Sequence, residues 1–191
     1  INDTKFYPNK GKERLKSMIE TRPDWCVSRQ RVWGVPIPAF ISKKTKEILV
    51  DDAIIENIAK IFEKEGADCW FEKDYKKFLG SKYKPEDYIK TTDIVEVWFD
   101  SGATHSYVLE KRKDLKWPAS MYLEGSDQHR GWFHSSLLES CGTRGRAPFE
   151  TILSHGFVVD GKGHKMSKSL GNIIAPEDIL KKYGADILRI W

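Results

Sequence analysis

The chain has 191 residues, of which 40% are hydrophobic and 31% charged, and its formal net charge at pH 7 is +4. This balance is typical of a soluble globular protein and too apolar for a disordered one, and no apolar run approaches membrane-spanning length. So small a positive charge does not by itself indicate a nucleic-acid partner.

The cysteines and histidines give no metal-binding or disulfide pattern. The three cysteines are far apart and odd in number, and none lies in a C-x-x-C spacing. The five histidines show no H-E-x-x-H or comparable ligand spacing. We therefore expect reduced thiols, no metal site and a cytoplasmic location. The absence of an initiator methionine at Ile1 suggests a chain cut from a longer one.

The first half of the chain changes character at about residue 43. Between residues 24 and 40, Pro36 and Pro38 forbid a helix and predict a turn followed by an extended segment. Residues 43–90 are rich in Lys, Glu and Asp and read as an insertion between two parts of a core, 1–42 and 91–191. Within it we predict a helix capped by Asp51 or Asp52 and ended by Gly66, with an apolar stripe of Ile54, Ile55, Ile58, Ile61 and Phe62.

Strands and helices alternate in the second half. We predict strands at 94–99, at 121–123 (short and buried) and at 151–159. Helices are expected from about Gln128 to Cys141, ending at Gly142, and from Pro176 to Gly184. Such alternation is typical of an α/β fold with parallel strand pairing.

Residues 165–169 read Lys-Met-Ser-Lys-Ser on a glycine-flanked loop. Lys165 and Lys168 can bring two flexible point charges to a polyphosphate and stabilise charge on a leaving pyrophosphate. Gly161 and Gly163 would let the loop close over a nucleotide. A solvated basic loop is the alternative for any K-x-x-K, and the full pentapeptide argues against it.

Residues 122–133 form a second string, in which a strand leads through a polar turn into a helix capped by Ser126 or Asp127. In α/β folds ligands bind where a strand end meets a helix N-terminus, and a carboxylate there can hold ribose hydroxyls or an ammonium group. Taken singly, Asp127 could be only a cap and Trp132 only core.

Two further strings contain candidate site residues, a tryptophan in one and two arginines in the other. The first is Val97-Trp98-Phe99-Asp100-Ser101-Gly102, in which Trp98 could be a core residue as readily as a pocket residue. The nearby His105 could be structural or lie at the edge of a pocket. In the string 25–31, Arg29 and Arg31 could meet phosphate, although surface ion pairs are the better interpretation.

One pattern is rejected. Residues 156–163 nearly match the phosphate-binding motif G-x-x-x-x-G-K-[ST], but Gly163 has no hydroxyl for magnesium and residues 157–159 read as strand.

The Lys165–Ser169 pentapeptide resembles the KMSKS motif of class I aminoacyl-tRNA synthetases, and the strings 125–133 and 98–102 resemble its isoleucine branch. The resemblance implies the second half of a Rossmann-like catalytic domain with an inserted small α/β segment. It implies that Lys168 is the main contact to the ATP phosphates and that Lys165 assists. It further implies adenylate contacts from Glu124, Gly125 and Asp127, and an amino-acid pocket lined by Trp98, Gln128 and Trp132.

The same resemblance implies activation of L-isoleucine with ATP and Mg²⁺, transfer to tRNA(Ile), no zinc in this segment and no membrane partner. No H-I-G-H motif is present, so the chain alone is expected to be inactive. Two alternatives remain open: a synthetase for valine or another aliphatic amino acid, and a non-enzymatic module that binds nucleotide or RNA.

Overall fold

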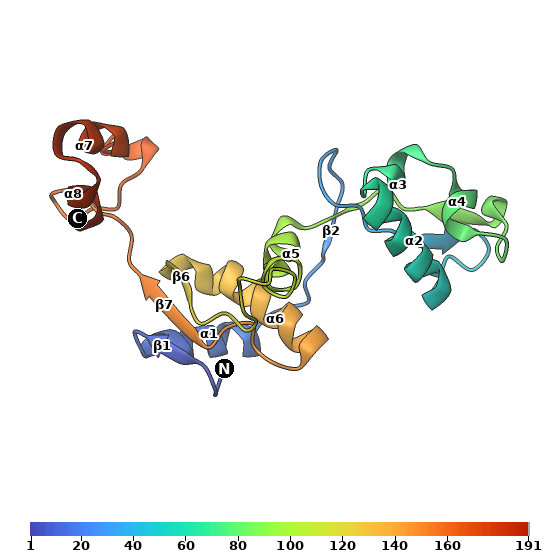
Figure 1. Ribbon diagram of the computed structural model, residues 1–191, viewed down its shortest axis with the longest axis horizontal. Coiled ribbons are helices and arrows are strands. Elements are labelled where there is room, and N and C mark those ends of the chain that lie inside the picture. Colours follow the sequence, from blue (N-terminus) through green and yellow to red (C-terminus); the bar gives the residue numbers. More distant parts are fainter. Residues whose placement is uncertain (191) are drawn as a thin grey trace.

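A computed structural model describes residues 1–190 as an elongated molecule with three parts along its long axis (Figure 1). The central part holds a three-stranded parallel sheet in the order β1 (Lys5–Tyr7), β7 (Thr151–His155), β6 (Tyr122–Gly125). Helix α6 (Trp132–Arg144) crosses from β6 to β7. The expected α/β fold with parallel pairing is therefore confirmed.

The central core lies between this sheet, α6 and α1 (Lys10–Glu20), a helix that the sequence analysis did not predict. Tyr122 on β6 and Ile152 on β7 are partners in register and are both buried. The remaining members of this cluster are Phe6, Leu15, Phe133, Leu137 and Phe149.

A second core lies at the opposite end of the molecule from the C-terminus (Figure 1). Here α2 (Asp52–Glu65), α3 (Cys69–Glu72), α4 (Tyr75–Leu79) and η1 (Pro85–Asp87) pack with an antiparallel pair, β3 (Phe40–Ser42) and β4 (Tyr88–Lys90). Phe40 is one of its buried members, although it precedes residue 43, where the insertion was expected to begin. The indole nitrogen of Trp70 in the same core donates to the carbonyl of Thr91, just beyond residue 90, at 2.8 Å.

Lys90 is buried at the centre of this second core. Its ammonium group donates to the carbonyl oxygens of Trp70 and Lys73 and lies 5.2–5.5 Å from three aromatic ring centres. Burial lowers the pKa of the Lys90 ammonium. The cation is thus held by carbonyl oxygens and ring faces.

Helix α2 follows the predicted signals closely. Asp51 is its N-cap and accepts from the amide of Ala53, and the chain leaves the helix at Gly66. Ile54 and Ile58 are buried as expected, but Ile55 is 54% exposed, so its place in the apolar stripe was wrong. Residue 55 lies one position, or about 100°, beyond Ile54 and so faces away from the core.

The predicted strand 94–99 is wrong beyond its second residue. Only β5 (Ile94–Val95) is extended, paired antiparallel with β2 (Ser28–Arg29), and α5 (Val97–Gly102) follows it. The carboxylate of Glu96 accepts from the amide of Trp98 at 2.9 Å and starts the helix. Helix η2 (His105–Leu109) continues from it, with His105 buried.

Three boundaries also shift. The strand expected at 121–123 is Tyr122–Gly125, and Met121 and Leu123 are exposed rather than buried. The helix expected from Gln128 is divided at Gly131 into η3 (Ser126–Arg130) and α6, which continues past Gly142 to a left-handed Gly145. Strand β7 ends at His155 rather than Val159.

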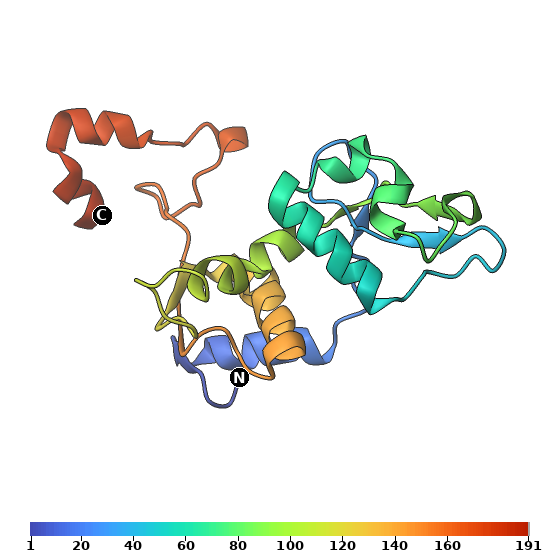
Figure 2. The ribbon, with the colours of Figure 1, turned by 45° about the vertical axis from the view of Figure 1, so that its right-hand side comes forward.

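The C-terminal part stands apart from the central sheet beyond β7 in both ribbon views (Figures 1 and 2). It contains η4 (Lys168–Leu170), α7 (Pro176–Tyr183) and α8 (Ala185–Ile190). Helix α7 begins at Pro176 and is followed by Gly184, as predicted. Within residues 1–190 the helices are too short or too polar to cross a membrane.

Helices α5 and α6 approach each other at Gly102. A Cβ on this residue would lie 2.2 Å from the carboxyl of Glu139 and 3.0 Å from the backbone of Ser135. The buried Oε1 of Glu139 has no hydrogen-bond partner. Burial, and next the charge of Asp100, raise the pKa of Glu139 from 4.5 to about 8.

Stability should therefore depend on pH through Glu139. Its pKa is higher in the folded than in the unfolded chain, so its contribution is complete below pH 4.5 and is lost as pH rises through about 8. We expect Glu139→Gln, which stays neutral, to match the wild type at pH 5 and to exceed its melting temperature by a few degrees at pH 8.5. Thermal unfolding across this range, with the exposed Glu63→Gln as control, measures the difference. Parallel melting curves at every pH would contradict the assignment.

Candidate functional site

The predicted turn lies at the carboxyl end of the parallel sheet. Gly125 at the end of β6 is in register with His155 at the end of β7. The exposed carboxylates of Glu124 and Asp127 flank Gly125. This edge, where strand ends meet a helix start, is the position at which α/β sheets bind ligands. His155 was not singled out in the sequence; its place beside Gly125 follows from the strand register.

A side chain at position 125 would have to displace the Asp127 carboxylate. A Cβ there would lie 2.6 Å from Oδ1 of Asp127 and 3.8 Å from Cε1 of His155. The other carboxylate oxygen of Asp127 accepts from the side-chain amide of Gln128 at 3.1 Å. The carboxylate is thus fixed over the backbone of the turn and remains open to solvent.

Gln128 caps α6, a role predicted for Ser126 or Asp127. Its Oε1 accepts from the amide of Trp132 at 2.9 Å, whereas neither predicted side chain caps the turn. Gly131 makes room for this carboxamide, because a Cβ there would lie 2.4 Å from Oε1 of Gln128 and 3.2 Å from the indole of Trp98. The side chain of Gln128 thus connects Asp127, through its amide, to α6, through its carbonyl oxygen.

The two tryptophans proposed for the amino-acid pocket have different surroundings. The ring of Trp132 stacks on Tyr122, with centres 4.0 Å apart and planes 4° apart, and its indole nitrogen donates to the carbonyl of Ser101 at 2.9 Å. Trp98, on α5, is 42% exposed and lies against Gly131. The Ser101 bond ties α5, which carries Trp98, to the start of α6.

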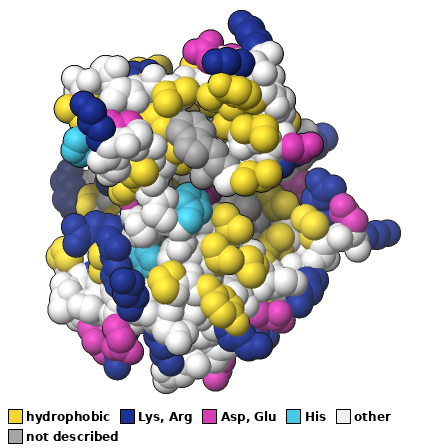
Figure 3. Space-filling model, turned by 90° about the vertical axis from the view of Figure 1, so that its left-hand side faces the viewer, with side chains coloured by type: hydrophobic (Ala, Val, Ile, Leu, Met, Phe, Trp, Pro, Cys, Tyr) yellow, Lys and Arg dark blue, Asp and Glu magenta, His cyan; other side chains and the backbone are white. Residues whose placement is uncertain are grey.

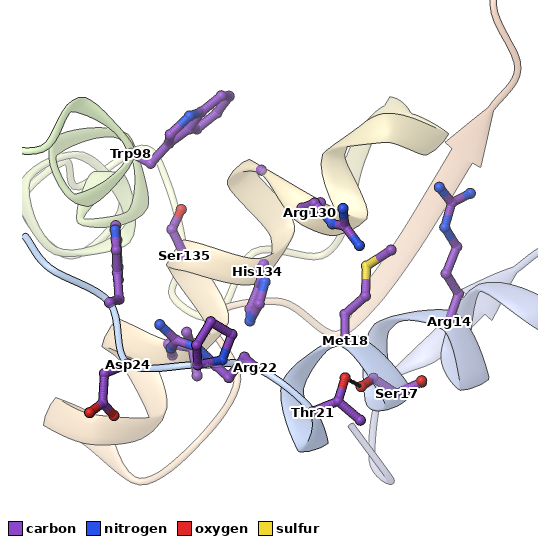
Figure 4. A pocket seen from close by; sticks show the side chains of 14 residues that line it. Arg14, Ser17, Met18, Thr21, Arg22, Asp24, Trp98, Arg130, His134 and Ser135 are labelled. Carbon is purple, nitrogen blue, oxygen red and sulfur yellow. Dashed lines mark hydrogen bonds between the residues drawn. The ribbon is translucent and has the colours of Figure 1, made fainter.

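A pocket of about 700 Å³ opens beside Trp98, between α1, α5 and α6 (Figure 4). Gly131, His134 and Ser135 form its α6 wall, and Trp98 reaches it from α5. The α1 side carries Arg14, and Arg22 follows on the chain segment after that helix. Glu124, Asp127, Gln128 and Trp132 are not among its lining residues, so Trp98 is the one residue of the predicted site that lines this pocket.

We call residues 156–172, which carry Lys165 and Lys168, the lysine loop. Hydrogen bonds from the side chains of Asp160 and Asn172 hold it together. Asp160 Oδ1 accepts from the amides of Lys162 and His164, each at 2.9 Å. The Asn172 side-chain amide donates to Asp160 Oδ2 at 2.9 Å, and its oxygen accepts from the amide of Ser167 at 2.9 Å. These bonds, chiefly that from Asn172, lower the pKa of the Asp160 carboxyl. Sequence reasoning missed both residues as positioning groups.

The two lysines of the loop are not equivalent. Lys165 lies opposite Val159 in an antiparallel bridge, with its ammonium group 3.6 Å from the ring centre of Phe157. Lys168 begins η4 and is exposed. Val159 and Lys165 pair across the Gly161–Gly163 turn and no helix starts directly at it, which agrees with the rejection of a nucleotide-binding strand–loop–helix motif at 156–163.

The structure does not bring the loop against the turn. Within residues 1–190 no hydrogen bond or ion pair joins 156–172 to 124–128. Viewed from the side of the C-terminal helices, hydrophobic side chains gather on this face and lysines and arginines lie at its margin (Figure 3). Exposed apolar and aromatic residues of this part include Leu170, Ile173, Ile174, Leu180, Tyr183, Ile187 and Ile190.

Of the remaining polar candidates, Arg29, His105 and His129 have structural partners. Arg31 forms no hydrogen bond or ion pair within residues 1–190, so the ion-pair interpretation was wrong for this residue. Arg29 donates to the carbonyls of Cys26 and Ser28 and lies 4.0 Å from Glu96, which supports the ion-pair interpretation. His105 and His129 are buried and hydrogen-bonded through Nδ1 to the carbonyls of Gly102 and Ser126. Over residues 1–190, no three His, Cys, Asp or Glu side chains form a cluster able to hold a metal.

Comparison with known proteins gives a consistent family. All residues 1–191 match the model of tRNA synthetases class I (I, L, M and V). The chain is 80% identical over its whole length to the isoleucine--tRNA ligase of Pelagibacter ubique and 59% identical to that of Brucella melitensis. It covers 21% and 20% of these two proteins, so it spans about a fifth of the length of the curated relatives it matches.

Two solved structures share the fold at low sequence identity. A leucyl-tRNA synthetase of Agrobacterium radiobacter, in a complex with tRNA and LeuAMS, has a TM-score of 0.60 at 19% identity over 93% of this chain and 27% of that one. A methionyl-tRNA synthetase of Mycobacterium tuberculosis bound by methionyl-adenylate has a TM-score of 0.57 at 18% identity over 99% and 28%.

The crowding at Gly131 gives a test of the turn. Gly131→Ala must displace the Gln128 carboxamide and remove its bond to the α6 amide, which should cost about 1–2 kcal/mol, as the loss of a helix cap does. Gly161→Ala, where a Cβ meets no atom within 4 Å, should cost far less. Urea unfolding of both variants measures the free energies. Equal costs would show that Gln128 does not hold the helix.

Proposed function

Because this chain belongs to the class I tRNA synthetases for isoleucine, leucine, methionine and valine, we propose that it forms the second half of a catalytic domain that activates L-isoleucine. In this proposal a cytoplasmic enzyme converts L-isoleucine and ATP to isoleucyl-adenylate and transfers the aminoacyl group to tRNA(Ile). The observation that carries the proposal is the whole-chain identity to isoleucine--tRNA ligases. The turn formed by residues 124–128, which we call the adenylate turn, and the lysine loop lie within that match.

ATP would bind between the adenylate turn and the lysine loop. Lys168 is exposed at the start of η4 and free to reach the phosphates, whereas Lys165 rests on Phe157 and assists. Their charges, with Mg²⁺ on the nucleotide, would stabilise the pyrophosphate that leaves. Closure of the loop over the turn is required, and the exposed Gly156, where a Cβ would meet no atom, is a suitable hinge.

The adenylate would lie along the end of β6. The backbone of Gly125 can approach it closely, and Glu124 and Asp127 present carboxylates to its ribose hydroxyls and ammonium group. Gln128 fixes the Asp127 carboxylate and so acts on the ligand partly through it.

The amino-acid side chain would lie among Trp98, Gln128 and Trp132. Aromatic walls give contact area to a branched aliphatic group and exclude larger ones. A missing methylene changes binding by only about 1–3 kcal/mol, a limit for which isoleucine against valine is itself the standard example. Discrimination beyond this limit would need a second, editing site elsewhere in the protein, and residues 1–191 by themselves would be inactive.

The identities to isoleucine--tRNA ligases disfavour the two alternatives that the sequence alone had left open. A valine or other aliphatic synthetase would use the same chemistry, and a non-enzymatic module would bind nucleotide or RNA without forming adenylate. ATP–pyrophosphate exchange by the full-length protein with isoleucine, valine and leucine decides among them. We expect the highest kcat/KM with isoleucine; preference for another amino acid, or no exchange, would overturn the proposal.

Removal of the Lys168 charge tests the phosphate role. Lys168→Ala in the full-length protein should slow exchange by a factor on the order of 10²–10³, as expected for one lost charge contact in the transition state. The KM for isoleucine should change little. Lys181→Ala on the exposed face of α7 is the matched control and should leave the rate unchanged. A wild-type rate for Lys168→Ala would exclude this role.

Truncation of Trp98 tests the amino-acid pocket. This residue is 42% exposed, so Trp98→Ala should leave the fold intact and raise the KM for isoleucine by roughly tenfold, as loss of an aromatic contact predicts. The KM for ATP should hardly change. Trp33→Ala, at a position 91% exposed, is the control. An effect on ATP alone would place the amino acid elsewhere.

A further inference from the structure

The contact between helices α5 and α6 is built around a carboxyl group that has no hydrogen-bond partner. The Oε1 atom of Glu139, on α6, is buried and makes no hydrogen bond within residues 1–190. A Cβ on Gly102 would lie 2.2 Å from this atom, so the carboxyl group lies directly against the backbone of α5. A carboxylate buried in this way loses its hydration without compensation, whereas a protonated carboxyl loses far less. The close approach of the two helices therefore depends on the protonation of Glu139.

Asp100 brings a second carboxyl group to the same contact. It lies on α5, two residues before Gly102. Burial, and then the charge of Asp100, raise the pKa of Glu139 to about 8. Neither carboxyl group takes part in an ion pair within residues 1–190. Above pH 8 two like charges would face each other across the contact, and their repulsion would oppose the packing of α5 on α6.

The other titratable groups near this contact do not compensate a charge on Glu139. They lie on η2, on β6 and at the end of α6, and they are His105, Tyr107, Glu110, Tyr122 and Arg144. Burial lowers the pKa of the His105 imidazole and raises that of the Tyr122 phenol, so both are neutral near pH 8. The Arg144 guanidinium donates to both carboxylate oxygens of Glu110, at 2.8 and 2.9 Å. Ionisation of Glu139 thus leaves an uncompensated negative charge between the helices.

Helix α5 connects this contact to Trp98. Trp98 lies four residues, or about one turn, before Gly102 and approaches Gly131 from the other end of the helix. The Ser101 carbonyl is held by the indole nitrogen of Trp132 at 2.9 Å. Because α5 has only six residues, it moves as one unit. A displacement at Gly102 would turn the helix about the Ser101 bond and carry Trp98 away from Gly131.

We propose that Glu139 is a positioning residue that acts through Trp98: its protonated carboxyl group holds α5 against α6 and so sets one wall of the amino-acid pocket. Ionisation of Glu139 releases α5, and the pocket loses part of this wall as the pH rises through about 8. The consequence for amino-acid binding rests on the proposed function. The coupling between Glu139 and Trp98 is a property of the two helices and does not depend on it.

The pH dependence of amino-acid binding by the full-length protein tests the proposal. In ATP–pyrophosphate exchange we expect the wild-type KM for isoleucine to rise by roughly three- to tenfold from pH 7 to about pH 9, at most the effect of losing the Trp98 contact. The KM for ATP should change much less. Glu139→Gln stays neutral and should keep the low KM throughout. The exposed Glu63→Gln is the matched control and should follow the wild type.

Asp100→Asn gives a second, directional test. It removes the charge that helps to raise the pKa of Glu139, so the midpoint of the rise in KM should move to lower pH. The ligand and all other groups titrate alike in every variant, and the differences between the profiles therefore report on Glu139. A midpoint that stays in place or moves to higher pH would overturn the inference, even if Glu139→Gln failed to fold.

Tryptophan fluorescence measures the coupling without catalysis. The difference between the emission of the wild type and that of Trp98→Phe isolates Trp98 from the other tryptophans. This emission should shift with a midpoint near pH 8, and it should stay constant when Glu139→Gln is present in both proteins. A constant wild-type emission, or the same shift with Glu139→Gln, would overturn the inference, as would identical KM profiles for the wild type and Glu139→Gln. The expected shift in a protein that shows no exchange with isoleucine would refute the proposed function alone.

Discussion

The stacked rings of Tyr122 and Trp132 are the contact on which the proposed site depends. Tyr122 is the first residue of β6 and Trp132 the first residue of α6, so the parallel stack joins the starts of the strand and of the helix on either side of the turn. The Tyr122 hydroxyl lies 3.1 Å from that of Ser136 one turn further along α6, which holds the strand and the helix in one register. The residues between β6 and α6 must therefore connect two elements whose positions are already fixed. For this reason Gly125 and Gly131 stand where the Asp127 and Gln128 side chains leave no space for a Cβ.

The lysine loop is organised by a different principle. Its internal bonds come from Asp160 and Asn172, and none of them depends on the turn. A loop closed on itself keeps its shape wherever the segment at Gly156 places it. The two halves of the proposed nucleotide site are therefore formed independently, the turn by core packing and the loop by local hydrogen bonds. Such a division suits a site in which one part must be fixed and another must move.

Local signals in the sequence predicted what local physics controls. Asp51, Gly66, Pro176 and Gly184 mark helix ends through their own backbone preferences, and the structure places those ends as expected. Trp98 shows the limit. The alternation around it is typical of a strand, but Glu96 caps a helix that packs on α6 at Gly102, a contact between residues more than 30 positions apart. Likewise, the sequence motifs led to a proposal for the residues of the site, whereas the cap from Gln128 and the approach of His155 to Gly125 required the folded register.

The position of α5 follows from the same long-range contacts. It affects both the amino-acid pocket proposed around Trp98 and the pocket between α1, α5 and α6. Trp132 holds the carbonyl of Ser101, and Gly102 lies against Glu139 and Ser135, so α5 is fixed at its carboxyl end. Trp98 projects from the other end of the helix and reaches Gly131. A shift of α5 would therefore move Trp98 relative to the adenylate turn and to the pocket between α1, α5 and α6 together.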